Sequence, residues 1–150
     1  DDLTLTAAGD LVLAVTGSVT GNITGDGTDT FKGFLQSITT TTTTPVTVTA
    51  ANSGSTYVSY GVAAGAANCV FNLPTCAAGL TYTFVDANST AADDLWVTAN
   101  TGDKINNGTA AKSFVNTGDV YGASVVLIGI DSTNWIAIPG AIGTWANDNN

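Results

Sequence analysis

The chain has 150 residues, enough for one domain with a sizeable core, and a formal net charge of −9. It contains no His, Arg, Met or Glu, so all twelve acidic residues are Asp and all three cations are Lys. Without His, neither a Ser–His–Asp nor a Cys–His catalytic system can be assembled. Without clustered Lys and Arg, nucleic acid is not expected as a partner.

Residues 1–37 are predicted to form an N-terminal β arm of short strands. Leu11, Leu13 and Val15 share one face of a segment that follows the turn sequence AAGD. A two-stranded unit of this size is marginal in water. We therefore expect the arm to pack on the main body or on another chain, with Leu11, Leu13 and Val15 at a subunit interface.

Six consecutive threonines, Thr39 to Thr44, precede Pro45. The branched β-carbon of Thr favours extended backbone. The run is identical on both faces, so it cannot set its own register, and Pro45 suits the start or edge of a strand. Residues 38–45 are thus predicted to be an extended connector, paired along a neighbouring chain.

Residues 46–150 are rich in Thr, Val and Gly, which favour strands and turns over helices. Turn sequences such as NSGS, TGDK and DSTN separate the apolar segments. This spacing predicts an all-β domain, an antiparallel β-sandwich or jelly roll. The predicted strands are residues 46–50, 56–60, 69–73, 80–85, 95–99, 112–116, 123–130 and 134–138.

The last two predicted strands, ASVVLIGI and NWIAI, form a hairpin that is apolar on both faces. Either it is a central, doubly buried strand pair, or its outer face is covered by the N-terminal arm or a second subunit. Its longest apolar run, VVLIGI, is strand-sized and far shorter than the roughly 20 residues that span a bilayer, so no membrane segment is expected. The candidate interface residues are Val126, Ile128, Ile130, Ile136 and Ile138.

Cys69 and Cys76 bracket the sequence CVFNLPTC. A disulfide bond would close a short loop if the two Cα atoms lie within about 7 Å. Alternatively, Cys69 is a buried apolar residue that shares a strand face with Phe71 and Leu73. The sequence leaves both possibilities open.

The remaining chemistry is weak. Residues 25–30 and 86–94 carry oxygen ligands suited to calcium, but Asp and Asn are also ordinary turn residues, and no metal or cofactor is expected. Asp93 and Asp94 are neighbours, so on a strand they point to opposite faces and do not form a glycosidase pair. The tryptophans and tyrosines could stack on a glycan, although such aromatic residues usually lie in the core.

Three stretches carry a resemblance to a known family: LPTCAAGLTYTF (73–84), GASVVLIGIDSTNWIAI (122–138) and GTW (143–145). Over residues 38–150 the chain resembles a β-domain of tailed-bacteriophage structural proteins, found in tail fibres and in capsid decoration or head-fibre proteins. The resemblance implies a non-enzymatic homotrimer on the virion exterior, bound to a capsid or other virion protein and reinforcing the shell.

Two alternatives remain. One is a secreted filament or surface-layer subunit, located outside the cell or on its surface, in which the N-terminal arm is exchanged as a strand between copies. The other is a fibre adhesion module that binds a glycan through its Trp residues.

Overall fold

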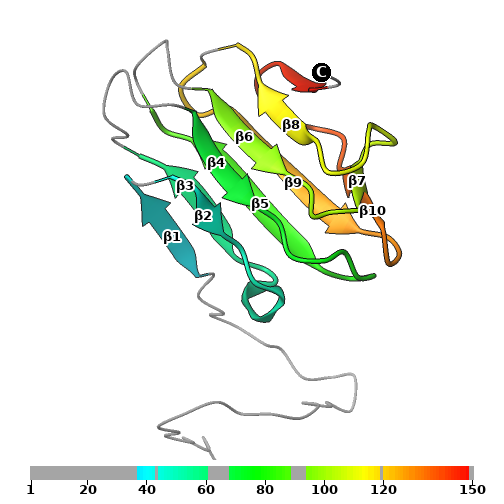
Figure 1. Ribbon diagram of the computed structural model, residues 1–150. Coiled ribbons are helices and arrows are strands. Elements are labelled where there is room, and N and C mark those ends of the chain that lie inside the picture. Colours follow the sequence, from blue (N-terminus) through cyan, green and yellow to red (C-terminus); the bar gives the residue numbers. More distant parts are fainter. Residues whose placement is uncertain (1–36, 43, 61–67, 89–93, 119, 149–150) are drawn as a thin grey trace, which may run out of the picture. The chain divides into compact units, whose positions relative to one another are not determined.

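The computed structural model divides the chain into two compact units, Asp1–Phe34 and Leu35–Asn150. All residues described below belong to the second unit (Figure 1). Of the predicted arm, residues 1–36, with Leu11, Leu13 and Val15, lie outside the described residues. These are residues 37–42, 44–60, 68–88, 94–118 and 120–148.

The second unit contains two β-sheets packed against each other (Figure 1). In spatial order, the six-stranded sheet comprises β1 (Ile38–Thr41), β3 (Thr56–Ser59), β5 (Thr81–Asp86), β9 (Ser124–Gly129), β10 (Asn134–Ala137) and β7 (Lys104–Ile105). The five-stranded sheet comprises β11 (Trp145–Asn147), β8 (Ser113–Asn116), β6 (Leu95–Thr98), β4 (Cys69–Asn72) and β2 (Val46–Thr47). A short 3-10 turn, η1 (Ala50–Asn52), follows β2.

The predicted all-β class is confirmed, and each of the eight strands predicted for residues 46–150 overlaps an observed strand. Three further strands, β1, β7 and β11, were not predicted. Two of these are only two or three residues long, and the third lies in the uniform Thr run, so none has an alternating pattern to reveal it.

The antiparallel arrangement predicted for the sheets is wrong, because five of the nine strand pairs are parallel. From β1 to β8 the chain passes alternately from one sheet to the other, so consecutive strands are not neighbours. Parallel strands need a crossover connection. Here the crossover between β3 and β5 includes β4 of the opposite sheet, and the crossover between β4 and β6 includes β5, so this part of the chain winds as a coil around the core.

The Thr run begins in β1, an edge strand of the six-stranded sheet. In β1, Ile38 is in register with Thr56 of β3, and Thr56 N–H donates to the Ser37 carbonyl at 2.9 Å. The chain then crosses to the five-stranded sheet, where the Thr44 hydroxyl accepts a hydrogen bond from Val70 N–H at 2.8 Å and donates to the Asn68 carbonyl at 3.1 Å. Residues 38–41 are therefore extended, but they pair with β3 of the same chain.

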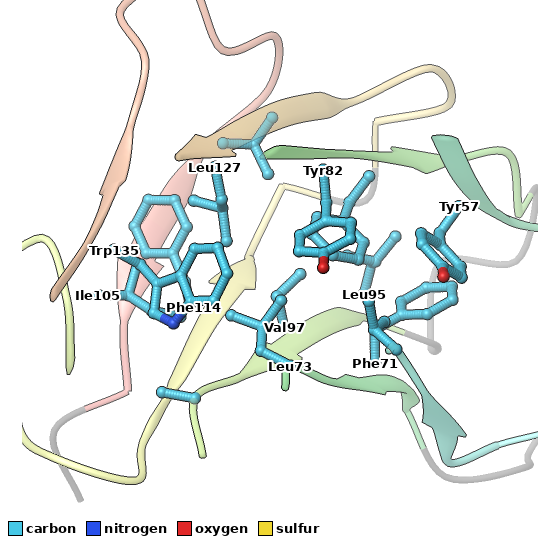
Figure 2. Packing of buried hydrophobic residues seen from close by; sticks show 14 of the residues in the cluster. Tyr57, Phe71, Leu73, Tyr82, Leu95, Val97, Ile105, Phe114, Leu127 and Trp135 are labelled. Carbon is cyan, nitrogen blue, oxygen red and sulfur yellow. The ribbon is translucent and has the colours of Figure 1, made fainter. Parts of the chain in front are cut away.

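The core lies between the two sheets and is rich in aromatic rings (Figure 2). Tyr57 and Phe84 from the six-stranded sheet stack at 5.8 Å between ring centroids, and Phe71 from the five-stranded sheet lies 5.4 Å from Phe84. At the other end, Trp135 is fully buried 5.8 Å from Tyr82. Such aromatic pairs add to the stabilisation from buried apolar area, so the inner faces of both sheets are fully used by the core.

Candidate functional site

On the outer side of the six-stranded sheet, the side chains of β1, β3, β5, β9 and the end of β10 form a regular surface without a charged residue, bordered by Asn134 and by exposed Lys104 of edge strand β7. Its side chains alternate with the buried inner ones along each strand. All but Ser124 are β-branched, and we call this set the β-branched face. It comprises Ile38, Thr40, Thr56, Val58, Thr81, Thr83, Val85, Ser124, Val126, Ile128, Ile136 and Ile138.

Strand register arranges the β-branched face in rows. Thr83 lies opposite Val126, and the N–H of Ile138 donates to the Val126 carbonyl at 2.9 Å. In the next row Ile128 lies opposite Ile136. The aliphatic side chains therefore gather on β9 and β10, whereas β5 contributes mainly Thr. Ile136 and Ile138 remain 37% and 38% exposed, which is unusual for adjacent aliphatic residues on a sheet that faces water.

The predicted β9–β10 hairpin is confirmed as an antiparallel pair. Trp135 and Leu127 point into the core and are fully buried. The doubly buried interpretation is wrong, because Ile136, Ile138 and Ile130 stay exposed, Ile130 to 54%. The five hairpin residues proposed from the sequence thus lie on one outward side, and Ile130 extends that side beyond the end of β9.

A small hollow marks one end of the β-branched face. It lies beside the segment that follows β10. This segment runs back alongside the start of β9, where Ser124 and Ile142 form two backbone hydrogen bonds of 2.9 Å with each other. Val126, Ile138 and Pro139 contribute to its lining, and its volume is about 80 Å³. A drug-sized ligand needs a few hundred Å³, so this hollow suits one inserted side chain.

The Thr and Val half of the face was missed by the sequence analysis. The strands containing Thr56, Val58, Thr81, Thr83 and Val85 were predicted, and their alternation already distinguished an outer side. The missing information was that β5 lies beside β9 and β3 lies beside β5. Because these strands are distant in sequence, no local pattern reports their adjacency.

A second feature missed by the sequence analysis is a buried carboxylate. Asp86 is 4% exposed, and its two oxygens accept hydrogen bonds from the Ser59 hydroxyl at 3.0 Å, the Asn88 N–H at 3.0 Å and the Asn116 amide at 3.1 Å. Ser59 belongs to the six-stranded sheet and Asn116 to the five-stranded sheet. The cluster therefore connects the two sheets through hydrogen bonds to a charged acceptor, which are stronger than neutral ones.

The two cysteines are free and buried, so of the two possibilities left open by the sequence the structure shows the one without a disulfide bond. Cys69 begins β4 and Cys76 lies beyond its other end, with its thiol 3.3 Å from the Asn134 carbonyl. Four extended residues at about 3.3 Å each separate Cys69 from Leu73 by roughly 13 Å. The intervening strand thus carries the two sulfur atoms apart, leaving Cys69 as the buried apolar residue of the alternative interpretation.

Burial raises the pKa of both thiols to about 11, with nearby Asp86 adding to the effect at Cys69 and Asp103 at Cys76. An unfolded thiol has a pKa near 9, so above that pH the unfolded state loses protons that the folded state retains. We expect stability to fall as pH rises from about 9 to 11. Thermal unfolding across this range should show the decline, and a Cys69→Ala, Cys76→Ala double variant should show a smaller one; equal slopes would contradict this origin.

The tryptophans fall into two environments. Trp135 is in the core, and Trp145 stacks on Phe114 at 5.5 Å, as expected for core aromatic residues. Trp96 instead lies on the outer side of β6, because its neighbours Leu95 and Val97 point inward. There it lines a hollow of about 320 Å³ together with Asp94, Val115, Thr117, Ala146, Asn147 and Asp148.

Other chemistry finds little support in the described part of the chain. Among residues that the structure describes, no three His, Cys, Asp or Glu side chains form a group able to hold a metal ion. Residues 25–30, the first of the two segments with calcium-type oxygen ligands, and Asp93 lie outside that part. A search of the same described residues for a helix long and apolar enough to cross a membrane found none.

Comparisons with known proteins do not assign this chain to a family. No protein-family model and no curated protein matches the chain. The resemblance to bacteriophage virion proteins therefore remains a prediction made from the sequence. The fold that carries the surface is nearly all β, with two mixed sheets packed together.

Proposed function

We propose that this chain is a non-enzymatic structural protein of a virus particle, attached on the outside of the shell to a capsid or other virion protein. The observation that carries the proposal is the β-branched face. Exposed, adjacent aliphatic side chains on a sheet are typical of surfaces that are covered by another protein. The motif resemblance of residues 73–84 and 122–138 supplies the virion context.

The overall composition supports a role in assembly. Only 10% of the residues are charged, against about 25% in an average soluble domain. A subunit that is largely surrounded by neighbours needs few surface charges to remain in solution. The free thiols are buried and their raised pKa keeps them protonated at neutral pH, so they offer no reactive nucleophile.

Immunogold electron microscopy tests this proposal. Antibodies raised against the purified chain are applied to source material fractionated by density, and gold is expected on the outside of virus particles. Label on extracellular filaments or on a regular cell-surface layer would overturn the proposal in favour of the filament alternative. Absence of the chain from every particle fraction would also reject it.

The hollow beside Trp96 favours a second candidate function, glycan binding. An indole ring provides a flat apolar surface, and Asp94, Asn147 and Asp148 place carboxylate and amide groups around it. Binding sites for small molecules combine apolar walls with a few polar groups in this way. The size of the hollow, about 320 Å³, fits one or two sugar rings.

If this hollow binds glycans, tryptophan fluorescence should change on titration with the matching member of a glycan panel. Trp96→Leu is expected to abolish the change and weaken binding at least tenfold, because the stacking surface is removed. Trp145→Phe is the matched control, since Trp145 packs on Phe114 away from this hollow, and it should leave the affinity unchanged. Fluorescence unaltered by the whole panel would exclude the glycan site.

A further inference from the structure

The β-branched face has the composition of an inner sheet face, although it lies outside. The row of Thr83, Val126 and Ile138 presents methyl groups and one hydroxyl, without a charge. Two sheets that pack face to face interdigitate side chains of this kind across a layer about 10 Å thick. The surface is therefore suited to another flat, uncharged β-sheet.

The positions of the described carboxylates are compatible with a second copy of this chain as that sheet. With a net charge of −9, two copies of this chain repel each other unless their contact keeps carboxylates apart. Asp86 and Asp103 are buried inside the unit, and Asp94 and Asp148 border the Trp96 hollow near the five-stranded sheet. Of the described carboxylates, only Asp131, in the β9–β10 turn, lies close to the β-branched face.

We propose that two copies of this chain stack with their β-branched faces in contact, with the aliphatic residues of β9 and β10 near the centre. This names a partner for the surface on which the proposed function rests. A face that meets its own copy forms a two-fold contact. The hollow beside Val126 then receives one aliphatic side chain of the opposing copy. Ile136 and Ile142, which are both exposed, are the candidates for this side chain.

The size of the face sets the expected affinity. Five strands of four to six residues, spaced about 4.8 Å apart at about 3.3 Å per residue, span roughly 24 by 13 to 20 Å. This is smaller than a standard interface, which buries about 800 Å² on each partner. The free protein is thus expected to pair with a dissociation constant in the micromolar range. Further contacts in a larger assembly would lower this dissociation constant.

Sedimentation equilibrium of the full chain between about 1 and 200 µM tests the pairing. A monomer–dimer equilibrium is expected. Ile136→Lys should raise the dissociation constant at least tenfold, because it places a charge in an apolar contact. Asn72→Lys makes the same change in charge on the outer side of β4, in the opposite sheet, and should leave the dissociation constant within twofold of the wild type.

Raising NaCl from about 0.05 to 0.5 M should strengthen pairing, because salt screens the repulsion between the two acidic chains.

Ile136 is already 37% exposed, so its replacement does not depend on core packing, and Ile138→Asn provides a second test without a new charge. A monomer at 200 µM, a trimer, or equal effects of Ile136→Lys and Asn72→Lys would overturn the proposal.

The two proposals fail separately. A chain that pairs through this face but never labels virus particles retains the pairing and loses the virion assignment. A chain that labels particles but stays monomeric loses the pairing, and the face then contacts a different virion protein.

Discussion

Replacing Asp86 with alanine is expected to lower the free energy of unfolding by about 3 kcal/mol. The change removes the acceptor for the Ser59 hydroxyl, the Asn88 N–H and the Asn116 amide, all within 3.1 Å of the carboxylate. Ser59 and Asn116 are at most 1% exposed, so water reaches them poorly as a replacement partner. Each buried donor without a partner costs about 1 to 3 kcal/mol, and relaxation recovers part of the sum.

Urea unfolding of three variants separates this cause from a general effect of mutation. Asp86→Asn keeps one oxygen for Ser59 and Asn88 but turns an amide toward the Asn116 amide, so its loss should fall between the wild type and Asp86→Ala. Asp131→Ala removes an exposed turn carboxylate that accepts the Thr133 and Asn134 N–H groups, and its effect should be much smaller. If Asp86→Ala and Asp131→Ala lose equal stability, the sheet-connecting role is incorrect.

Gly129→Ala is expected to destabilise the fold by about 3 kcal/mol, although it adds a single methyl group. Gly129 lies at the end of β9, where a β-carbon would overlap the carbonyl oxygen of Ala77 and lie 3.1 Å from the Cys76 sulfur. The neighbouring backbone cannot move aside easily, since Gly129 N–H donates to the Leu80 carbonyl at 2.8 Å and the Gly129 carbonyl accepts from Gly79 N–H at 2.9 Å.

The matched control is Gly102→Ala. A β-carbon at Gly102 meets no atom within 4 Å, but the residue has φ +91°, so alanine there brings backbone strain without a clash. Its cost should be about 1 to 2 kcal/mol. Thermal and urea unfolding of both variants should therefore show that Gly129→Ala is clearly the less stable. The reverse order would show that the backbone around Ala77 moves aside despite its hydrogen bonds, and would contradict the predicted clash.

Local pattern was enough to locate most strands. The strands predicted at residues 80–85 and 123–130 correspond to β5 and β9, whose inward side chains include Tyr82, Phe84, Val125 and Leu127. The β9–β10 hairpin was equally readable, because its two strands are joined by a short turn in which Asp131 accepts N–H groups from Thr133 and Asn134. Contacts between residues close in sequence leave a signal in the sequence.

The pairing of strands that are distant in the sequence left no such signal. The antiparallel prediction assumed that successive strands pair, whereas the chain crosses between the sheets and makes β3 and β5 parallel neighbours. The Asp86 cluster illustrates the same limit, because Ser59 and Asn116 lie 27 and 30 residues from it. In the sequence, Asp86 resembles any turn residue of an Asn- and Asp-rich loop.

By itself, the sequence determined that this protein is built of short strands, that it lacks the side chains of His-based catalysis, and that its final hairpin is apolar on both sides. Tertiary structure decided which of those sides is buried. It also joined the outward Ile and Val residues of β9 and β10 to the Thr and Val residues of β3 and β5 in one uncharged surface. Alternation along a strand is a property of consecutive residues, whereas a continuous face depends on the order of strands across a sheet, which long-range hydrogen bonds and core packing establish.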